Sequence, residues 1–181
     1  MSGILYGVGV GPGDPELMTL KAVRLIKEND IIAVPGADVR ETVAYKIAVQ
    51  AVPELADKEL LPIYMPMTHD KAELELNHEK GAKALEAALD TGKNVVFLTL
   101  GDPTIYSTYM YIHRIVKAKG YETTIISGIP SFCAAAARMD DSLVDRAEEL
   151  HVIPSSYGIE AALNYSGTKI LMKSASGISE V

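Results

Sequence analysis

The sequence is poor in cysteine and in positive charge, and each shortage excludes a class of protein. Its 181 residues include one cysteine, Cys133, so no disulfide can form within the chain. Proteins from reducing compartments typically show this usage. Lys and Arg number 17 against 24 Asp and Glu, for a formal net charge of −7. Nucleic acids and anionic membranes require a dominant basic field, so we expect neither as a partner.

The sequence also has no uncharged apolar stretch long enough to span a bilayer. Its N-terminus has neither the basic segment nor the long apolar run of a secretory signal peptide. The histidines are scattered without the spacing of metal ligands, so no metal site is predicted. We therefore expect a cytoplasmic protein that binds no membrane.

Apolar runs alternate with helix-forming segments along the chain, a pattern that predicts parallel βαβ units and an α/β fold. Strands are expected at 4–9, 30–34, 59–63, 94–100, 123–127, 151–154 and 169–172. Helices are expected at 17–27, 42–51, 69–90, 105–118, 131–139 and 159–163. The predicted organisation is a parallel-sheet N-terminal domain, residues 1–128, followed by a smaller α/β domain, residues 129–181. A charged turn at 140–149 is a second candidate for the boundary.

Three short segments follow predicted strands and precede predicted helices. Residues 7–15 read Gly-Val-Gly-Val-Gly-Pro-Gly-Asp-Pro, residues 101–108 Gly-Asp-Pro-Thr-Ile-Tyr-Ser-Thr, and residues 127–133 Ser-Gly-Ile-Pro-Ser-Phe-Cys. Glycine lets a ligand approach the backbone closely, because no Cβ stands in the way. Ligands of open parallel sheets bind beyond the carboxyl ends of the strands. The three segments therefore predict one cleft lined by backbone amides and carbonyls.

The glycine-rich first segment is open to other interpretations. A nicotinamide-dependent oxidoreductase would carry a dinucleotide site there. However, Asp14 and Glu16 place two carboxylates where a pyrophosphate would sit, and the second strand runs into Pro35 and not into an acid that binds ribose. A tight turn without a ligand is another alternative. Likewise, Asp102 is either a helix N-cap followed by Pro103 at the first helical position, or a contact to a cationic or hydroxyl-bearing ligand.

Taken together, the three segments resemble the signatures of the tetrapyrrole (corrin and porphyrin) methylases, and the likeness runs over essentially the whole chain. Residues 8–14 with 17–22 are similar to the first signature, 101–103 to the second and 127–131 to the third. Within the family, residues 101–109 are most similar to C20-methyltransferases acting on precorrin-2 or cobalt-factor II. The resemblance implies S-adenosyl-L-methionine as the cofactor and precorrin-2 or cobalt-factor II as the tetrapyrrole substrate. It also implies a role in cobalamin biosynthesis and a homodimer. Another corrin or uroporphyrinogen methylase remains the nearer alternative.

Position by position, the resemblance also implies site residues. The implied cofactor contacts are Pro12, Leu100, Gly101, Asp102, Ile105, Pro130, Ser131, Phe132, Met172 and Lys173. The candidate substrate contacts are Gly13, Asp14, Tyr106 and Tyr109. Tyr106, Tyr109 and His113 would share one helix face, which could instead be a half-buried packing surface with a satisfied histidine.

Methyl transfer from a sulfonium to carbon is an in-line displacement, and positioning and desolvation supply much of its catalysis. It needs no enzyme nucleophile, so the sequence assigns no catalytic residue. The chain stops at Val181, soon after the last predicted strand, whereas the family's second domain continues. We therefore expect a truncated second domain, which leaves a ligand-binding remnant without turnover as a further alternative.

Overall fold

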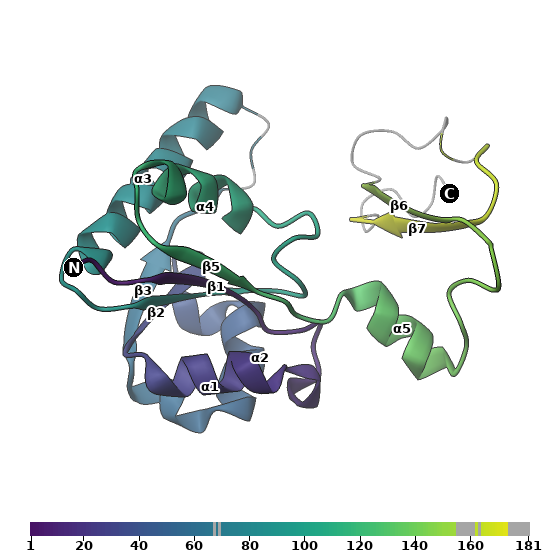
Figure 1. The fold of residues 1–181 in the computed structure, drawn as a ribbon, viewed down its shortest axis with the longest axis horizontal. Coiled ribbons are helices and arrows are strands. Elements are labelled where there is room, and N and C mark those ends of the chain that lie inside the picture. Colours follow the sequence, from purple (N-terminus) through teal and green to yellow (C-terminus); the bar gives the residue numbers. More distant parts are fainter. Residues whose placement is uncertain (67, 69, 155–161, 163, 174–181) are drawn as a thin grey trace. The chain divides into compact units, whose positions relative to one another are not determined.

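The computed structural model describes residues 1–66, 68, 70–154, 162 and 164–173. The chain divides into two units, residues 1–130 and 131–181 (Figure 1). The helix predicted at 159–163 falls outside the described part of the chain, except for Ala162.

A parallel sheet of five strands forms the centre of the first unit. The strands are β1 (Leu5–Gly9), β2 (Ile31–Pro35), β3 (Glu59–Ile63), β4 (Val95–Thr99) and β5 (Thr123–Ile126). They lie in the order β3-β2-β4-β1-β5, and every neighbouring pair is parallel. Each strand lies within one residue of its predicted bounds, so the predicted parallel α/β fold is confirmed.

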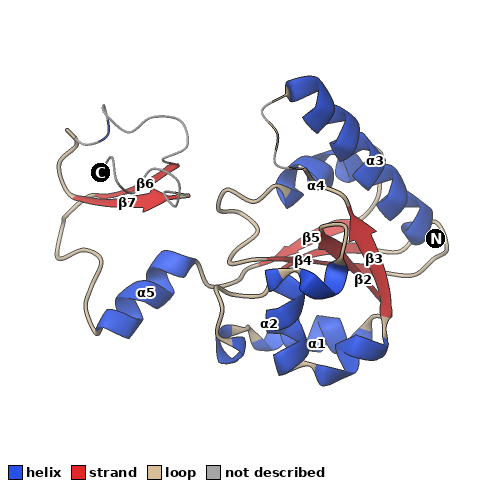
Figure 2. Ribbon diagram, turned by 180° about the vertical axis from the view of Figure 1, so that it is seen from behind, coloured by secondary structure: helices blue, strands red, loops and turns tan. Residues whose placement is uncertain are grey.

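Helices cover both faces of this sheet (Figure 2). One face packs on α1 (Leu20–Glu28) and α2 (Val43–Ala51), and the other on α3 (Lys71–Leu89) and α4 (Tyr109–Ala118). Successive side chains of a strand point to opposite faces, so a strand buried on both faces is apolar throughout. In β4, Val96 and Leu98 join the α1–α2 core, while Val95 and Phe97 join the α3–α4 core.

The first and fourth helices begin later than predicted. Thr19 caps α1, since its Oγ1 accepts a hydrogen bond from the Ala22 amide at 3.2 Å. Asp14 instead caps a short 3-10 helix, η1 (Pro15–Leu17), by accepting from the Glu16 amide at 2.9 Å. The remaining 3-10 helices of this unit are η2 (Val39–Glu41) and η3 (Pro53–Asp57).

The predicted start of the fourth helix at residue 105 is wrong, because α4 begins at Tyr109. Tyr106 has a φ of 48°, a left-handed conformation that no helix residue adopts. Next to it, the Ser107 hydroxyl lies 2.9 Å from the Thr99 hydroxyl at the end of β4 and also accepts from the Tyr109 amide at 3.3 Å. These bonds hold residues 106–108 as a loop.

The second unit contains α5 (Ser131–Met139) and two parallel strands, β6 (Leu150–Pro154) and β7 (Thr168–Met172). Their bounds also lie within one residue of the prediction. Among the residues that the structure describes, no helix has both the length and the apolar content needed to cross a membrane.

Candidate functional site

The sheet topology places one edge of the first unit in a position that suits ligand binding. Strands β1 and β4 are parallel neighbours, so both end at the same edge. The chain leaves β1 toward α1 on one face and leaves β4 toward α4 on the other (Figure 2). Neighbouring strands whose connections diverge form a topological switch point, where open α/β sheets bind ligands.

Three loops meet at this edge, one from each of the adjacent strands β4, β1 and β5. We call them the β1 loop (residues 10–17), the β4 loop (residues 100–108) and the β5 loop (residues 127–130). The β1 and β4 loops are joined by backbone hydrogen bonds, from the Gly101 amide to the Gly11 carbonyl at 2.8 Å and in reverse at 3.3 Å. Both glycines have a positive φ, 77° at Gly11 and 68° at Gly101, which glycine adopts without strain.

Two further glycines let the loops approach each other. A Cβ added at Gly9 would lie 2.5 Å from the Gly101 carbonyl oxygen and 2.7 Å from the Gly128 amide nitrogen. A Cβ added at Gly128 would meet the same carbonyl oxygen and the Gly9 backbone. The sequence suggested that glycines here admit a ligand, whereas Gly9 and Gly128 admit neighbouring backbone. By contrast, a Cβ at Gly13 would have nothing within 4 Å.

The buried carboxylate of Asp102 joins the β4 loop to the β5 loop. Its Oδ1 accepts hydrogen bonds from the Thr104 amide at 2.7 Å and the Thr104 hydroxyl at 2.5 Å. Its Oδ2 accepts from the Gly128 amide at 2.9 Å. Because α4 starts at Tyr109, Asp102 is not its N-cap, and that interpretation of the sequence is wrong. No pattern in the sequence indicated that Gly128, 26 residues further along the chain, is the partner of Asp102.

The predicted cofactor contacts divide between the two units. Pro12, Leu100, Gly101, Asp102, Ile105 and Pro130 all lie on the three loops of the first unit. Among them, Leu100 is half exposed, at 50%. Ser131 and Phe132 open α5 of the second unit, where Met172 ends β7 and Lys173 follows it.

Not all of the predicted substrate contacts are exposed at the loop edge, the edge of the sheet where the β1, β4 and β5 loops meet. Gly13 and Asp14 are exposed on the β1 loop, and Tyr106 is 42% exposed on the β4 loop. Tyr109 is only 1% exposed, so the structure places it in the core. Its ring packs on Phe97 at a centroid distance of 4.8 Å.

The hydroxyl of Tyr109 also has a partner in the core, 3.0 Å away at His113 Nδ1. Burial raises the pKa of Tyr109 far above its usual value. Burial, and next the charges of Lys117 and Arg114, lower the pKa of His113. The pair is therefore a neutral packing feature, as the alternative interpretation of this helix face predicted.

The charged side chains at the loop edge are all acidic. Asp14, Glu16 and Asp102 lie on the three loops, which contain no Lys or Arg. Like charges close to a bound phosphate would disfavour it, whereas a cationic ligand would be attracted. The residues present thus suit a ligand that carries positive charge.

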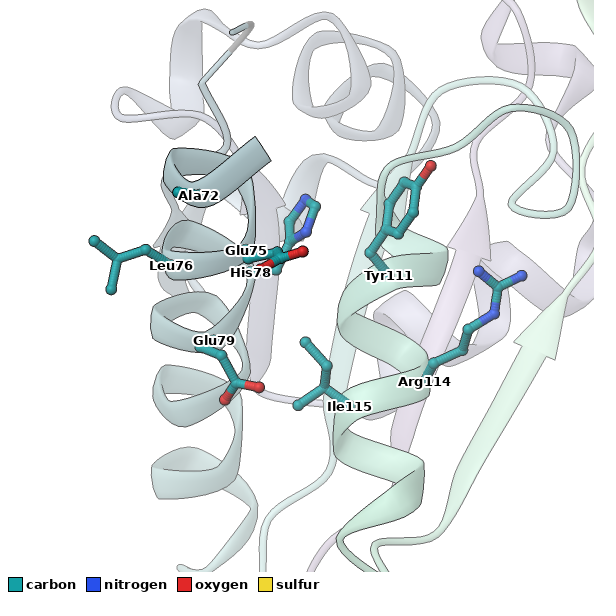
Figure 3. A pocket seen from close by; sticks show the side chains of 8 residues that line it. All are labelled: Ala72, Glu75, Leu76, His78, Glu79, Tyr111, Arg114 and Ile115. Atoms are coloured by element: carbon teal, nitrogen blue, oxygen red, sulfur yellow. The ribbon is translucent and has the colours of Figure 1, made fainter. Parts of the chain in front are cut away.

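A pocket of about 560 Å³ lies between α3 and α4, and none of the residues that line it belongs to the three loops. There the rings of His78 and Tyr111 stack at a centroid distance of 4.9 Å, with Glu75 and Arg114 nearby (Figure 3). Burial lowers the pKa of His78, an effect that the charge of Glu75 opposes. In the described residues, no group of three or more His, Cys, Asp or Glu side chains could hold a metal ion.

The fold and the loops together define the class: an open parallel α/β protein whose candidate ligand site lies at the switch point between β1 and β4. The chain belongs to the tetrapyrrole (corrin/porphyrin) methylases, a family whose model matches residues 4–181. The sequence signatures that suggested this family lie on the three loops and in the ends of the strands and helices that flank them.

Curated relatives share much of the sequence. A probable cobalt-precorrin-2 C(20)-methyltransferase of Methanocaldococcus jannaschii is 38% identical over 93% of this chain and 71% of its own length. The cobalt-precorrin-2 C(20)-methyltransferase of Salmonella typhimurium is 33% identical over 96% of this chain and 73% of its own length.

Solved structures show the same fold. A cobalamin synthesis related protein from Corynebacterium diphtheriae superposes with a TM-score of 0.68 at 20% identity, over 84% of this chain and 64% of that one. The uroporphyrin-III C-methyltransferase of Thermus thermophilus, complexed with S-adenosylhomocysteine, superposes with a TM-score of 0.60 at 23% identity. That match covers 83% of this chain and 54% of the other.

Proposed function

We propose that the chain binds S-adenosyl-L-methionine at the three loops and transfers its methyl group to C20 of precorrin-2 or cobalt-factor II in cobalamin biosynthesis. The substrate class follows from the relatives, whose names specify C20 methylation of cobalt-precorrin-2. The observation that carries the cofactor proposal is the charge of the loop edge, which holds three carboxylates and no Lys or Arg. S-adenosyl-L-methionine carries a sulfonium and an ammonium group against a single carboxylate, so its net charge is positive, and this field attracts it and opposes a dinucleotide.

The chain's own groups at the edge fit such a cofactor. Leu100 and Ile105 supply apolar surface from the β4 loop, and Pro12 faces the same edge from the β1 loop. Open space beside Gly13 leaves room for a ligand against the backbone. We propose the same role for the second-unit residues that the family resemblance implies, Ser131, Phe132, Met172 and Lys173.

Catalysis in this scheme depends on positioning. The cofactor supplies an activated methyl group when bound, and the loops hold it in one orientation and exclude water. The backbone contacts among Gly9, Gly101 and Gly128 make the loops rigid before any ligand arrives. Such preorganisation lowers the entropic cost of reaching a reactive geometry.

Calorimetry with the purified chain tests the proposal. Titration of S-adenosylhomocysteine should give saturable binding, and NADH in parallel should give none. Methyl transfer is then measured with precorrin-2, cobalt-factor II and uroporphyrinogen III. Turnover of either of the first two supports the proposal, whereas preference for uroporphyrinogen III replaces its substrate. Binding of NADH without S-adenosylhomocysteine would reject the cofactor and favour an oxidoreductase.

We also propose a homodimer, as the family resemblance implies. Light scattering coupled to size-exclusion chromatography measures the molar mass directly. A mass twice that of the chain agrees with the proposal, and a monomer at micromolar concentration contradicts it.

A further inference from the structure

Both carboxylate oxygens of Asp102 accept hydrogen bonds from the protein itself. Oδ1 is bonded within the β4 loop, to the amide and hydroxyl of Thr104, and Oδ2 is bonded to Gly128 of the β5 loop. Only 8% of the residue's surface is exposed. A carboxylate offers about four lone-pair sites, so three donors occupy most of its capacity. Little of it remains for a ligand.

These bonds act where the loops are already close. Gly128 lies against Gly101, the residue before Asp102, at a distance that excludes any side chain. A hydrogen bond to an ionised acceptor is stronger than one between neutral groups. Asp102 therefore sets the separation of the two loops and the direction in which the β4 loop presents Leu100 and Ile105.

We propose that Asp102 is a positioning residue of the cofactor site, acting through Thr104 and Gly128 and not by touching the cofactor. The inference rests on the proposed function and changes the role of one residue in it. A direct contact and a positioning role both predict that Asp102→Ala weakens binding. They differ in what Thr104 does.

A double-mutant cycle separates the two roles. The dissociation constant of S-adenosylhomocysteine is measured by calorimetry for the wild type, Asp102→Ala, Thr104→Val and the double variant. We expect Asp102→Ala to weaken binding about tenfold and Thr104→Val about threefold, from the usual cost of one lost hydrogen bond. The double variant should be no weaker than Asp102→Ala, because Thr104 acts through the same carboxylate. A neutral Thr104→Val, or two effects that multiply, overturns the proposal.

A spectroscopic readout in the ligand-free protein tests the bond to Gly128. Asp102→Asn keeps the side-chain volume but has one neutral acceptor oxygen in place of a charged carboxylate, so any hydrogen bond that the Gly128 amide keeps is weaker. We expect the Gly128 amide proton to shift upfield and to exchange faster with solvent. If both the shift and the exchange rate stay unchanged in folded Asp102→Asn, the proposal fails.

Asp70→Ala is the matched control. Asp70 Oδ1 accepts from the amides of Ala72 at 2.9 Å and Glu73 at 3.2 Å, within the first turn of α3. We expect this variant to lose stability while the Gly128 amide and the ligand affinity stay unchanged. If the wild type binds no S-adenosylhomocysteine, the proposed function fails, and the positioning of a cofactor by Asp102 fails with it. If the wild type binds and the cycle is additive, only the positioning role fails.

Discussion

The loop edge and the α3–α4 pocket are built in opposite ways. At the loop edge, Gly9, Gly101 and Gly128 bring backbone against backbone with no side chain between them. In the pocket, side chains on two helix surfaces form the walls, and the stacked rings of His78 and Tyr111 are among them (Figure 3). Backbone atoms in a sheet cannot move aside, whereas surface side chains change rotamer at low cost. The comparison therefore predicts that the loop edge tolerates amino-acid substitutions far less well than the pocket does.

The largest effect is expected from Gly9→Ala. The new Cβ would lie 2.5 Å from the Gly101 carbonyl oxygen and 2.7 Å from the Gly128 amide nitrogen, so strands or loops must separate. We expect a loss of about 3 kcal/mol in the free energy of unfolding, at the upper end for overpacking, and no measurable binding of S-adenosylhomocysteine. Urea denaturation and calorimetry measure the two.

Gly81→Ala on α3 is the matched control for this effect. Its Cβ would meet the ends of two side chains, Ile112 Cδ1 at 2.8 Å and Ile63 Cγ2 at 2.9 Å. Alanine also gains about 1 kcal/mol of helix propensity over glycine, so the net change in stability should be small. Equal losses for Gly9→Ala and Gly81→Ala would break the distinction between backbone and side-chain walls.

A smaller effect is expected from Tyr109→Phe. The change removes the hydroxyl that lies 3.0 Å from His113 Nδ1 and leaves that nitrogen without this partner in the core. We expect a loss of about 1–2 kcal/mol in stability, with unchanged affinity for S-adenosylhomocysteine because Tyr109 is buried. Weakened affinity in a variant of unchanged stability would return Tyr109 to the binding site.

Acidification should destabilise the protein through two histidines, His113 in the core and His78 in the α3–α4 pocket. Burial lowers the folded-state pKa of His113 and of His78, so the folded protein binds fewer protons than the unfolded chain below the ordinary histidine pKa of about 6.5. Stability should therefore be level above that pH and fall as the pH drops from about 7 toward the lowered pKa values. Denaturation at pH 7.5 and 5.5 measures the difference, and His113→Gln should reduce it. An equal slope in His113→Gln would assign the effect to other groups.

Most of the fold could be predicted from the sequence because its signals are local. The strands are short apolar runs bounded by glycine, proline or charge, and a buried strand such as β4 has no competing pattern. The family signatures likewise lie in continuous segments, on the three loops and in the elements that flank them. These segments end up together because parallel strands share one carboxyl edge.

The remaining features depend on contacts between residues distant in sequence. The predicted start of α4 at residue 105 was wrong because the left-handed Tyr106 and the hydrogen bond between Thr99 and Ser107 hold these residues as a loop. The burial of Tyr109 could not be predicted, because spacing shows which residues share a helix face, and not which way that face turns. The hydrogen bond that the Gly128 amide donates to Asp102 joins two loops at the sheet edge and leaves no pattern in the sequence.

The smallest effect is expected in the α3–α4 pocket, from Tyr111→Ala. Tyr111 is 53% exposed, and its stacking on His78 should be worth no more than about 0.5–1 kcal/mol. We expect a loss of stability within that range and unchanged affinity for S-adenosylhomocysteine, since the ring lies in the α3–α4 pocket and is not part of the three loops. Denaturation and calorimetry on the same preparation measure both quantities, with Tyr111→Phe as the control that keeps the ring. A tenfold loss of affinity in Tyr111→Ala, restored by Tyr111→Phe, would mean that the pocket binds the ligand through its aromatic wall. The backbone edge would then not be the site.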